Sequence, residues 1–297
     1  MNKKTKQIVL PLITALIWGC AFVAQKSGAD VLGALTFTWT RYLLAALALL
    51  AFLALRAKRG GGTLREAFSG AWTGGLVMGT LLMIASNLQQ YGMNFTTAGK
   101  AGFVTALYIV IVPLLGLFLR KRVRLLVWCG VAVAVAGLYF LSFAAGGAPT
   151  FNAGDLYVLG CALVFSVHIL CVDHFTVKSD GVVLACLQFF VAAGESLVLA
   201  IFTEGFPVGA ILECALPILY AGLISGGIGY TLQIVAQKDG DPAVVSLLLS
   251  LESLFAAVSG AVLLHERLSA RELLGCALML FAVVLVQLPE GKKREVC

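Results

Sequence analysis

The sequence predicts an all-α integral membrane protein: ten transmembrane helices that form two inverted five-helix repeats. Three observations lead to this prediction. The composition is unusually apolar, the apolar residues fall into runs of membrane-spanning length, and the basic residues cluster between certain runs.

The composition indicates a lipid environment. Hydrophobic residues make up 60% of the 297 residues, charged residues make up 12%, and the mean hydropathy is +0.98. A soluble domain is typically about 45–50% apolar and about 25% charged. A soluble fold of this length could not bury so much apolar surface, so we expect the chain to lie in a bilayer.

A helix needs about 20 predominantly apolar residues to cross the hydrocarbon core. The expected spans are 8–25, 32–55, 72–93, 101–119, 125–143, 156–173, 182–202, 210–235, 243–264 and 272–288. The first run follows Lys3, Lys4 and Lys6, as the apolar region of a signal peptide would. It is long for such a region, and no convincing small-residue cleavage site precedes Lys26, so we interpret it as the first span.

The basic residues predict the orientation. With the N-terminus inside, the clusters within residues 3–6, 56–65, 120–124 and 292–294 all fall in cytoplasmic segments. Positive charge marks the cytoplasmic loops of membrane proteins. We therefore expect a multi-pass protein of the cytoplasmic (inner or cell) membrane with both termini in the cytoplasm. The net charge of +6 is explained by topology and gives no reason to expect a nucleic-acid partner.

The two halves of the chain are weakly similar. A stretch of small residues and proline separates residues 1–146 from residues 152–297, and each half carries five expected spans. Asn87-Leu88-Gln89 in the third span matches Thr231-Leu232-Gln233 in the eighth. Because five is odd, the halves must lie in opposite orientations, which is a construction common in secondary transporters. The alternative is a duplicated membrane protein that does not transport, such as a scaffold or sensor.

Several short motifs occur in the order found in one known family. They are the run from Thr96 to Val104 with Tyr108 and Pro113 after it, Trp18-Gly19, Arg41 with Ala45, and Leu264-His265-Glu266-Arg267-Leu268. With them the chain resembles the EamA-type drug/metabolite transporter superfamily over essentially its whole length, as two repeats. The resemblance implies a ten-helix bundle whose central cavity moves metabolites, amino acids or drug-like compounds, often outward.

The chain departs from the family pattern at two positions. Ser253 follows Glu252 where the family usually has proline, so the residue that would kink the ninth helix is missing. Lys121 stands in the first half where a glutamate would correspond to Glu266. Neither departure affects the expected fold.

Ionisable residues inside a membrane are costly, so they are candidates for function. Glu252, Glu195 and His168 are candidates for coupling, with static hydrogen bonding or packing as the alternative for each. Arg41 could receive an anionic group of a substrate or neutralise one of the two glutamates. Lys100 begins the fourth span, where it could attract anions or extend to the membrane surface.

Polar and aromatic residues on several spans could line the cavity together with these charges. The candidates for substrate binding are Trp18, Trp39, Arg41, Gln89, Lys100, Tyr108, Gln188, Tyr230 and Gln233.

No motif of a hydrolase, a metalloprotease or a nucleotide-binding protein is present, so we expect no catalytic site and no cofactor. The eight cysteines show no zinc-ligand spacing and are interpreted as small apolar residues. Without a nucleotide-binding domain, active transport must be secondary. The leading prediction is a carrier of small organic solutes, with protons as a candidate coupling ion. An uncoupled uniporter or channel, or a non-transporting sensor or scaffold, is the alternative.

Overall fold

The computed structural model describes residues 3–60, 63–96, 98–120, 123–142, 152–238, 240–263 and 269–288. Every regular element within these ranges is helical, which confirms the predicted all-α class. Eight helical stretches, some of them made of consecutive shorter helices, are long and apolar enough to cross a membrane. The motif at residues 264–268, Lys121 and the junction between the predicted halves lie outside the described residues.

The helices follow one another through short connections. Those before residue 152 are α1 (Lys3–Ala29), α2 (Ala34–Gly60), α3 (Leu64–Phe68), α4 (Trp72–Gly92), α5 (Ala98–Ala106), α6 (Tyr108–Phe118) and α7 (Leu125–Ser142). Those after it are α8 (Ala153–Thr176), α9 (Gly181–Thr203), α10 (Val208–Glu213), α11 (Ala215–Leu219), the π-helix η1 (Tyr220–Tyr230), α12 (Thr231–Gln237), α13 (Pro242–Leu249), α14 (Glu252–Leu263) and α15 (Ala270–Gln287).

Two predicted spans are interrupted near their middle. The fourth consists of α5 and α6, which meet at Leu107, and the ninth consists of α13 and α14, which are separated by Ser250 and Leu251. The ninth helix therefore breaks although it lacks the proline of the family pattern. The Ser250 hydroxyl donates back to the carbonyl of Leu247, a local bond that competes with regular helix hydrogen bonding.

The eighth span begins later than predicted and is irregular. Residues 208–213 form the separate helix α10, so the membrane-spanning stretch runs from Ala215 to Gln237 and not from residue 210. Its centre is the eleven-residue π-helix, an uncommon form that is frequent at functional sites. Four glycines fall within it, which leaves room for neighbouring helices to approach.

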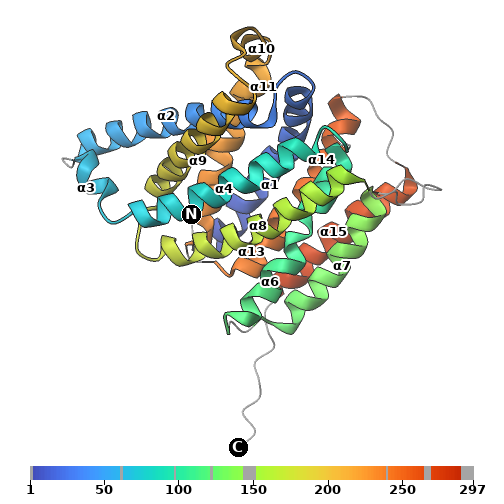
Figure 1. Ribbon diagram of the computed structural model, residues 1–297. Coiled ribbons are helices and arrows are strands. Elements are labelled where there is room, and N and C mark those ends of the chain that lie inside the picture. The colour runs from blue at the N-terminus through green and yellow to red at the C-terminus, as the bar shows by residue number, and fades with distance from the viewer. Residues whose placement is uncertain are drawn as a thin grey trace, which may run out of the picture.

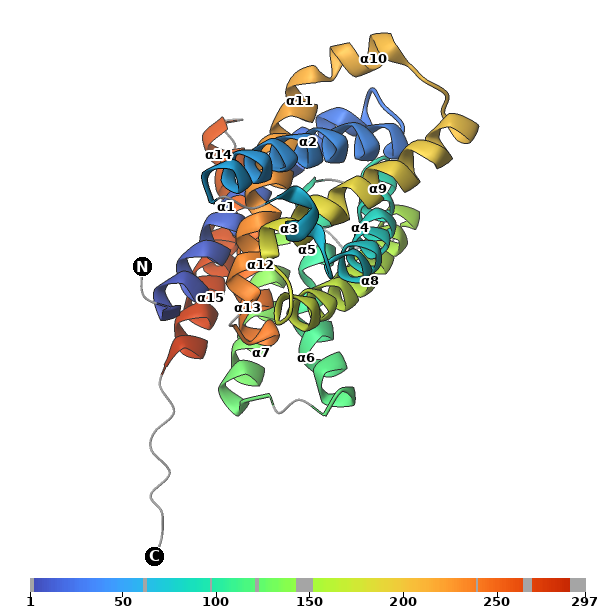
Figure 2. The same cartoon turned by 90° about the vertical axis from the view of Figure 1, so that its left-hand side faces the viewer.

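The helices pack into one bundle whose main contacts join the two halves (Figure 1). Helix α2 packs along α9, α7 packs along α15, and α4 packs against both α8 and α9. Helix α1 packs against α14 and η1. Figure 2 shows α10 and α11 at one end of the bundle and the last residues of α6 and first residues of α7 at the other.

Glycine allows the closest of these approaches. A Cβ atom added to Gly79 of α4 would lie 2.8 Å from the carbonyl oxygen of Gln188 and 2.5 Å from Cβ of Val191, both on α9. Backbone at that distance cannot give way as a flexible side chain can. The α4–α9 seam therefore depends on small residues, as helix pairs in membranes commonly do.

Helices α2 and α9 also fix each other's starts. The Glu204 carboxylate, just after α9, accepts hydrogen bonds from the backbone amides of Leu35 (3.1 Å) and Thr36 (2.8 Å) in the first turn of α2. Asp180 caps the start of α9 and pairs with Arg56 near the end of α2 at 3.2 Å. Side chains thus bond the amides at both helix starts that have no partner within their own helix.

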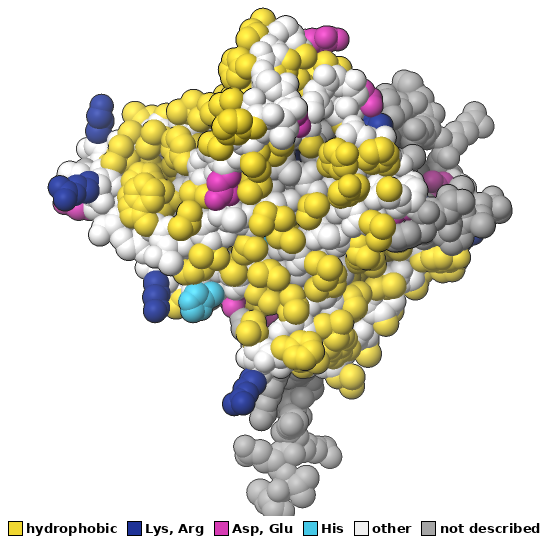
Figure 3. Space-filling model, in the orientation of Figure 1, with side chains coloured by type: hydrophobic (Ala, Val, Ile, Leu, Met, Phe, Trp, Pro, Cys, Tyr) yellow, Lys and Arg dark blue, Asp and Glu magenta, His cyan; other side chains and the backbone are white. Residues whose placement is uncertain are grey.

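The surface agrees with a membrane location. Apolar side chains cover the face shown in Figure 3, over α2, α4, α8, α9 and α7, and Lys and Arg side chains lie at its edges. Many large apolar residues are exposed, among them Phe118 and Phe202. An exposed apolar surface of this kind suits lipid.

The Gly79 contact predicts an effect on stability. Gly79→Ala should lower the melting temperature of the detergent-solubilised protein by roughly 2–8 °C, because overpacking a tight seam costs about 1–3 kcal/mol. Gly194→Ala on α9 is the matched control, since a Cβ there meets nothing within 4 Å and alanine favours helix. Equal melting temperatures for the two variants would contradict the proposed seam.

Candidate functional site

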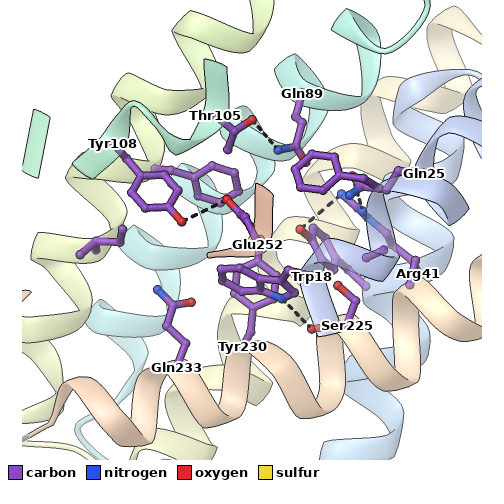
Figure 4. A pocket seen from close by; sticks show the side chains of 16 residues that line it. Trp18, Gln25, Arg41, Gln89, Thr105, Tyr108, Ser225, Tyr230, Gln233 and Glu252 are labelled. Atoms are coloured by element: carbon purple, nitrogen blue, oxygen red, sulfur yellow. Dashed lines mark hydrogen bonds between the residues drawn. The ribbon is translucent and has the colours of Figure 1, made fainter. Parts of the chain in front are cut away.

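A cavity lies inside the bundle between helices from both halves (Figure 4). Its volume is about 40 Å³. The residues that line it are Trp18, Ala21, Phe22, Gln25, Arg41, Tyr42, Gln89, Thr105, Tyr108, Phe165, Ile169, Ala221, Ser225, Tyr230, Gln233 and Glu252. By volume the cavity has room for about three water molecules.

The two broken helices place an acidic group in the cavity. Glu252 is the first residue of α14 and Tyr108 is the first residue of α6, so each directly follows a helix break. The hydroxyl of Tyr108 donates to Oε1 of Glu252 at 3.0 Å. Next to this pair, the hydroxyl of Ser253 donates to the carbonyl of Gly102 on α5 at 3.0 Å. The breaks thus hold a buried carboxyl group at the cavity.

Arg41 places a buried positive charge on another part of the lining. Its Nη1 donates to Oε1 of Gln25 at 3.1 Å, and its guanidinium lies over the rings of Phe37 and Tyr42. Among the described residues, no carboxylate lies within 4.0 Å of it, and its Nε is buried without a hydrogen-bond partner. The ion pair with Glu195 or Glu252 that the sequence left open is therefore not formed. Arg41 retains its capacity to bind an anionic group.

Aromatic rings form the wall between the charges. The rings of Trp18 and Tyr230 lie 4.6 Å apart, and Tyr42 meets Tyr230 edge-on at 6.4 Å. Trp18 Nε1 donates to the carbonyl of Ser225 in the π-helix at 3.3 Å. This bond fixes the indole and leaves its faces for packing. Flat aromatic faces of this kind suit the apolar part of an organic solute or a cationic group.

The structure brings seven of the twelve predicted residues together at the cavity. They are Trp18, Arg41, Gln89, Tyr108, Tyr230, Gln233 and Glu252. It places the other five elsewhere, namely Trp39, Lys100, Gln188, Glu195 and His168.

Three of these five residues lie in packing positions. Trp39 stacks on Phe206 with ring centroids 5.6 Å apart, because two residues along a helix turn its side chain by about 200° from that of Arg41. His168 Nε2 and Gln188 Oε1 share a hydrogen bond of 3.0 Å, so the two side chains pair between α8 and α9. They lie beside the cavity and not on it.

The two remaining charged residues have partners outside the cavity. Oε1 of Glu195 accepts a hydrogen bond from Thr80 at 2.7 Å across the α4–α9 seam. Lys100 pairs with Asp155 at 2.6 Å, and the side chain of Asp155 is fully buried. Asp155 also accepts from Thr96 at 3.2 Å and from the amide of Asn152 at 2.8 Å. This cluster, which we call the Asp155 clamp, ties the start of α5 to the start of α8.

Four polar residues on the lining were not singled out by the sequence. They are Gln25, Tyr42, Thr105 and Ser225. Gln25 follows Trp18 by seven residues, a helical spacing that places both on one face and could have identified it. Thr105 has no such signal, because the break at Leu107 alters the periodicity between it and Tyr108. Ser225 lies in the π-helix, where side chains do not follow the 3.6-residue period.

Comparisons with known proteins agree with this architecture. The model of the EamA-like transporter family matches residues 5–143 and again residues 152–288. An uncharacterized transporter of Archaeoglobus fulgidus is 31% identical over 282 residues, which cover 93% of this chain and 84% of that protein. The uncharacterized inner membrane transporter YedA of Escherichia coli is 27% identical over 292 residues, covering 94% and 92% of the two chains.

A solved structure shares the fold. A crystal structure that is 18% identical covers 95% of this chain and 96% of its own, with a TM-score of 0.79. At that identity the likeness concerns the fold alone. The family match spans nearly the whole chain in two copies and coincides with helices that can cross a membrane. The chain is therefore a multi-pass membrane protein that belongs to the EamA-like transporter family.

Proposed function

We propose that the protein is a secondary transporter that exports small organic metabolites across the cytoplasmic membrane by alternating access. The observation that carries this proposal is the buried cavity, which both halves of the chain line and which holds Arg41 and Glu252 without an ion pair between them. Transporters bind substrate near the membrane midplane between repeats, and charged groups there mark the substrate or ion path.

The proposal includes ten spanning segments in two inverted repeats, residues 1–146 and 152–297. Helix α4 (21 residues) and helix α7 (18 residues) supply the spans beyond the eight that are long and apolar enough. The packing supports the repeat, because it maps onto itself when the halves are exchanged. Equivalent helices pair as α2 with α9 and α7 with α15, and α4 packs on α8 and α9 as η1 packs on α1 and α2.

The charge pattern supports the orientation. With both termini in the cytoplasm, the basic clusters face the cytoplasm and the Asp155 clamp lies at the outer ends of α5 and α8. The clamp then holds the outer side of the bundle together. Opening to the outside requires α5 and α8 to separate there.

The cavity supports a substrate of mixed charge, such as an amino acid or a similar drug-like compound. It offers a cation at Arg41, a carboxyl group at Glu252 and aromatic faces between them. The lining is shared by helices of both halves, as expected for a carrier that binds its substrate between repeats.

An uncoupled uniporter is the second candidate, and Glu252 separates the two. Glu252→Gln keeps the shape and the bond from Tyr108 but cannot exchange a proton. We expect liposomes with the wild-type protein to concentrate a solute from a labelled pool of amino acids and organic acids under an imposed pH gradient. Liposomes with the variant should accumulate the solute at least about tenfold less than wild type, a difference that corresponds to about 1.4 kcal/mol.

The matched control is Glu195→Gln, which neutralises a carboxyl group in the α4–α9 seam away from the cavity. It should leave accumulation within about twofold of wild type, apart from effects on protein yield. If Glu252→Gln moves the solute as well as wild type and only downhill, proton coupling through Glu252 is excluded and the uniporter becomes the leading function.

The Asp155 clamp predicts a change in access. In a variant without native cysteines, Thr105→Cys places a thiol on the cavity. Asp155→Asn should increase its labelling by a membrane-impermeant maleimide added outside by about fivefold or more, because loss of one partner of a buried ion pair is strongly destabilising.

Asp30→Asn is the control for the clamp. It removes an ion pair with Lys26 that lies on the same predicted side but is exposed, with side chains 36% and 61% accessible. Such a pair contributes little, so the labelling rate should stay at the wild-type value. An unchanged rate in Asp155→Asn as well would show that the clamp does not control access.

A further inference from the structure

The hydrogen bonds around one cavity residue, Gln233, fix the direction of its side-chain amide. Gln233 is 1% exposed, and its Nε2 donates to Oε1 of Gln237 at 3.1 Å. Nε2 of Gln237 in turn donates to the backbone carbonyl of Ile169 at 3.2 Å. Oε1 of Gln233 is buried and has no hydrogen-bond partner. Gln233 therefore uses its nitrogen for Gln237 and keeps its oxygen without a partner.

The orientation follows from chemistry as well as from placement. An amide can be turned end for end, and its direction must be inferred from its partners. A backbone carbonyl only accepts, so Gln237 must direct its NH₂ group at Ile169 and its oxygen at Gln233. Gln233 must then use its own NH₂ group for Gln237. The carbonyl of Ile169 thus sets the direction of both amides.

Gln89 shows the contrast. Its Nε2 meets the hydroxyl of Thr105 at 3.0 Å. A hydroxyl both donates and accepts, so this bond holds with the amide in either direction. Gln89 can adapt to a donor or an acceptor on a ligand, whereas Gln233 presents only an acceptor.

A second acceptor lines the same part of the cavity. The carboxyl group of Glu252 accepts from Tyr108 through Oε1, and no donor other than Tyr108 bonds it among the described residues. In Figure 4 the amide oxygen of Gln233 lies on the side of Trp18 and Glu252, and its nitrogen lies on the far side. An unpartnered buried acceptor is unfavourable, so the arrangement favours a ligand that brings N–H donors.

We infer that Gln233 Oε1 and the Glu252 carboxylate together recognise a protonated amine of the substrate, and that Gln237 is a positioning residue for this site. Gln237 is fully buried and does not line the cavity, so it acts only through Gln233. This inference rests on the proposed function and narrows its substrates to compounds with an ammonium group.

The experiment uses ligand pairs that differ only in the amine. They are L-alanine and propanoate, L-leucine and 4-methylpentanoate, and L-phenylalanine and 3-phenylpropanoate. Affinities are measured by calorimetry on the full-length protein in nanodiscs, with no gradient present. The wild type should bind the amine-bearing member of at least one pair about tenfold more tightly or better, since a hydrogen bond to a charged group is stronger than a neutral one.

Gln237→Leu should reduce this preference about tenfold and change the affinity for the deaminated acid by less than twofold. Gln233→Leu should do the same by removing the acceptor itself. In the double variant Gln233→Glu with Gln237→Leu the preference should return, because a carboxylate presents an oxygen whichever way it turns. Such a rescue is not expected if Gln237 only supports packing.

Gln188→Leu is the matched control, because it removes a fully buried glutamine that pairs with His168 beside the cavity. Its preference for the amine should equal that of wild type. An unchanged preference in Gln237→Leu, equal wild-type binding of both members of every pair, or binding of none of them would overturn the inference. Uptake of another solute by wild-type liposomes would in that case leave the proposed transport function standing.

Discussion

The structure depends on one constraint of the bilayer: no water is available there to satisfy backbone amides and carbonyls, so each must find a partner within the protein. Regular helices meet this constraint by themselves. At the breaks at Leu107 and at Ser250–Leu251 the backbone amides bond carbonyls three or four residues earlier, as Leu107 N does to Val104 O at 3.2 Å and Leu251 N to Leu248 O at 3.3 Å. There the Ser253 hydroxyl bonds the carbonyl of Gly102, so one broken helix is supported by the other.

The cavity follows from the position of these breaks. Each break ends one helix and starts the next, so the first residue after it can point inward without regard to the preceding face. Tyr108 and Glu252 hold these positions and bond each other. Arg41, in contrast, lies on an uninterrupted helix and reaches the cavity because small residues bring η1 close to α2, with Gly222 beside the carbonyl of Arg41. Irregular backbone thus places the carboxyl group of Glu252, and close packing places the guanidinium of Arg41.

The sequence predicted the helical membrane fold and the family, because both depend on properties summed over long stretches. Site residues on regular helices were also predictable: Trp18 and Arg41 belong to uninterrupted helices and reach the cavity. Lys100, Glu195 and His168 are candidates because ionisable groups in a membrane are costly. A partner nearby in space offsets this cost equally well, and Asp155, Thr80 and Gln188 are such partners. No local pattern could reveal these pairings, which span 20 to 115 positions in the chain. Gln237 was not identified for a related reason, since its importance lies in a bond to the carbonyl of Ile169.

In the π-helix between Tyr220 and Tyr230, the eighth span has more residues per turn than an α-helix has. A π-turn holds roughly one residue more than an α-turn, so relaxing one turn to α geometry would turn everything after it by about 100°. Tyr230 and Gln233 lie at and just beyond its end, and both line the cavity. A change of one residue in winding would thus exchange one set of lining side chains for another. The composition of the cavity lining is then tied to the pitch of one helix.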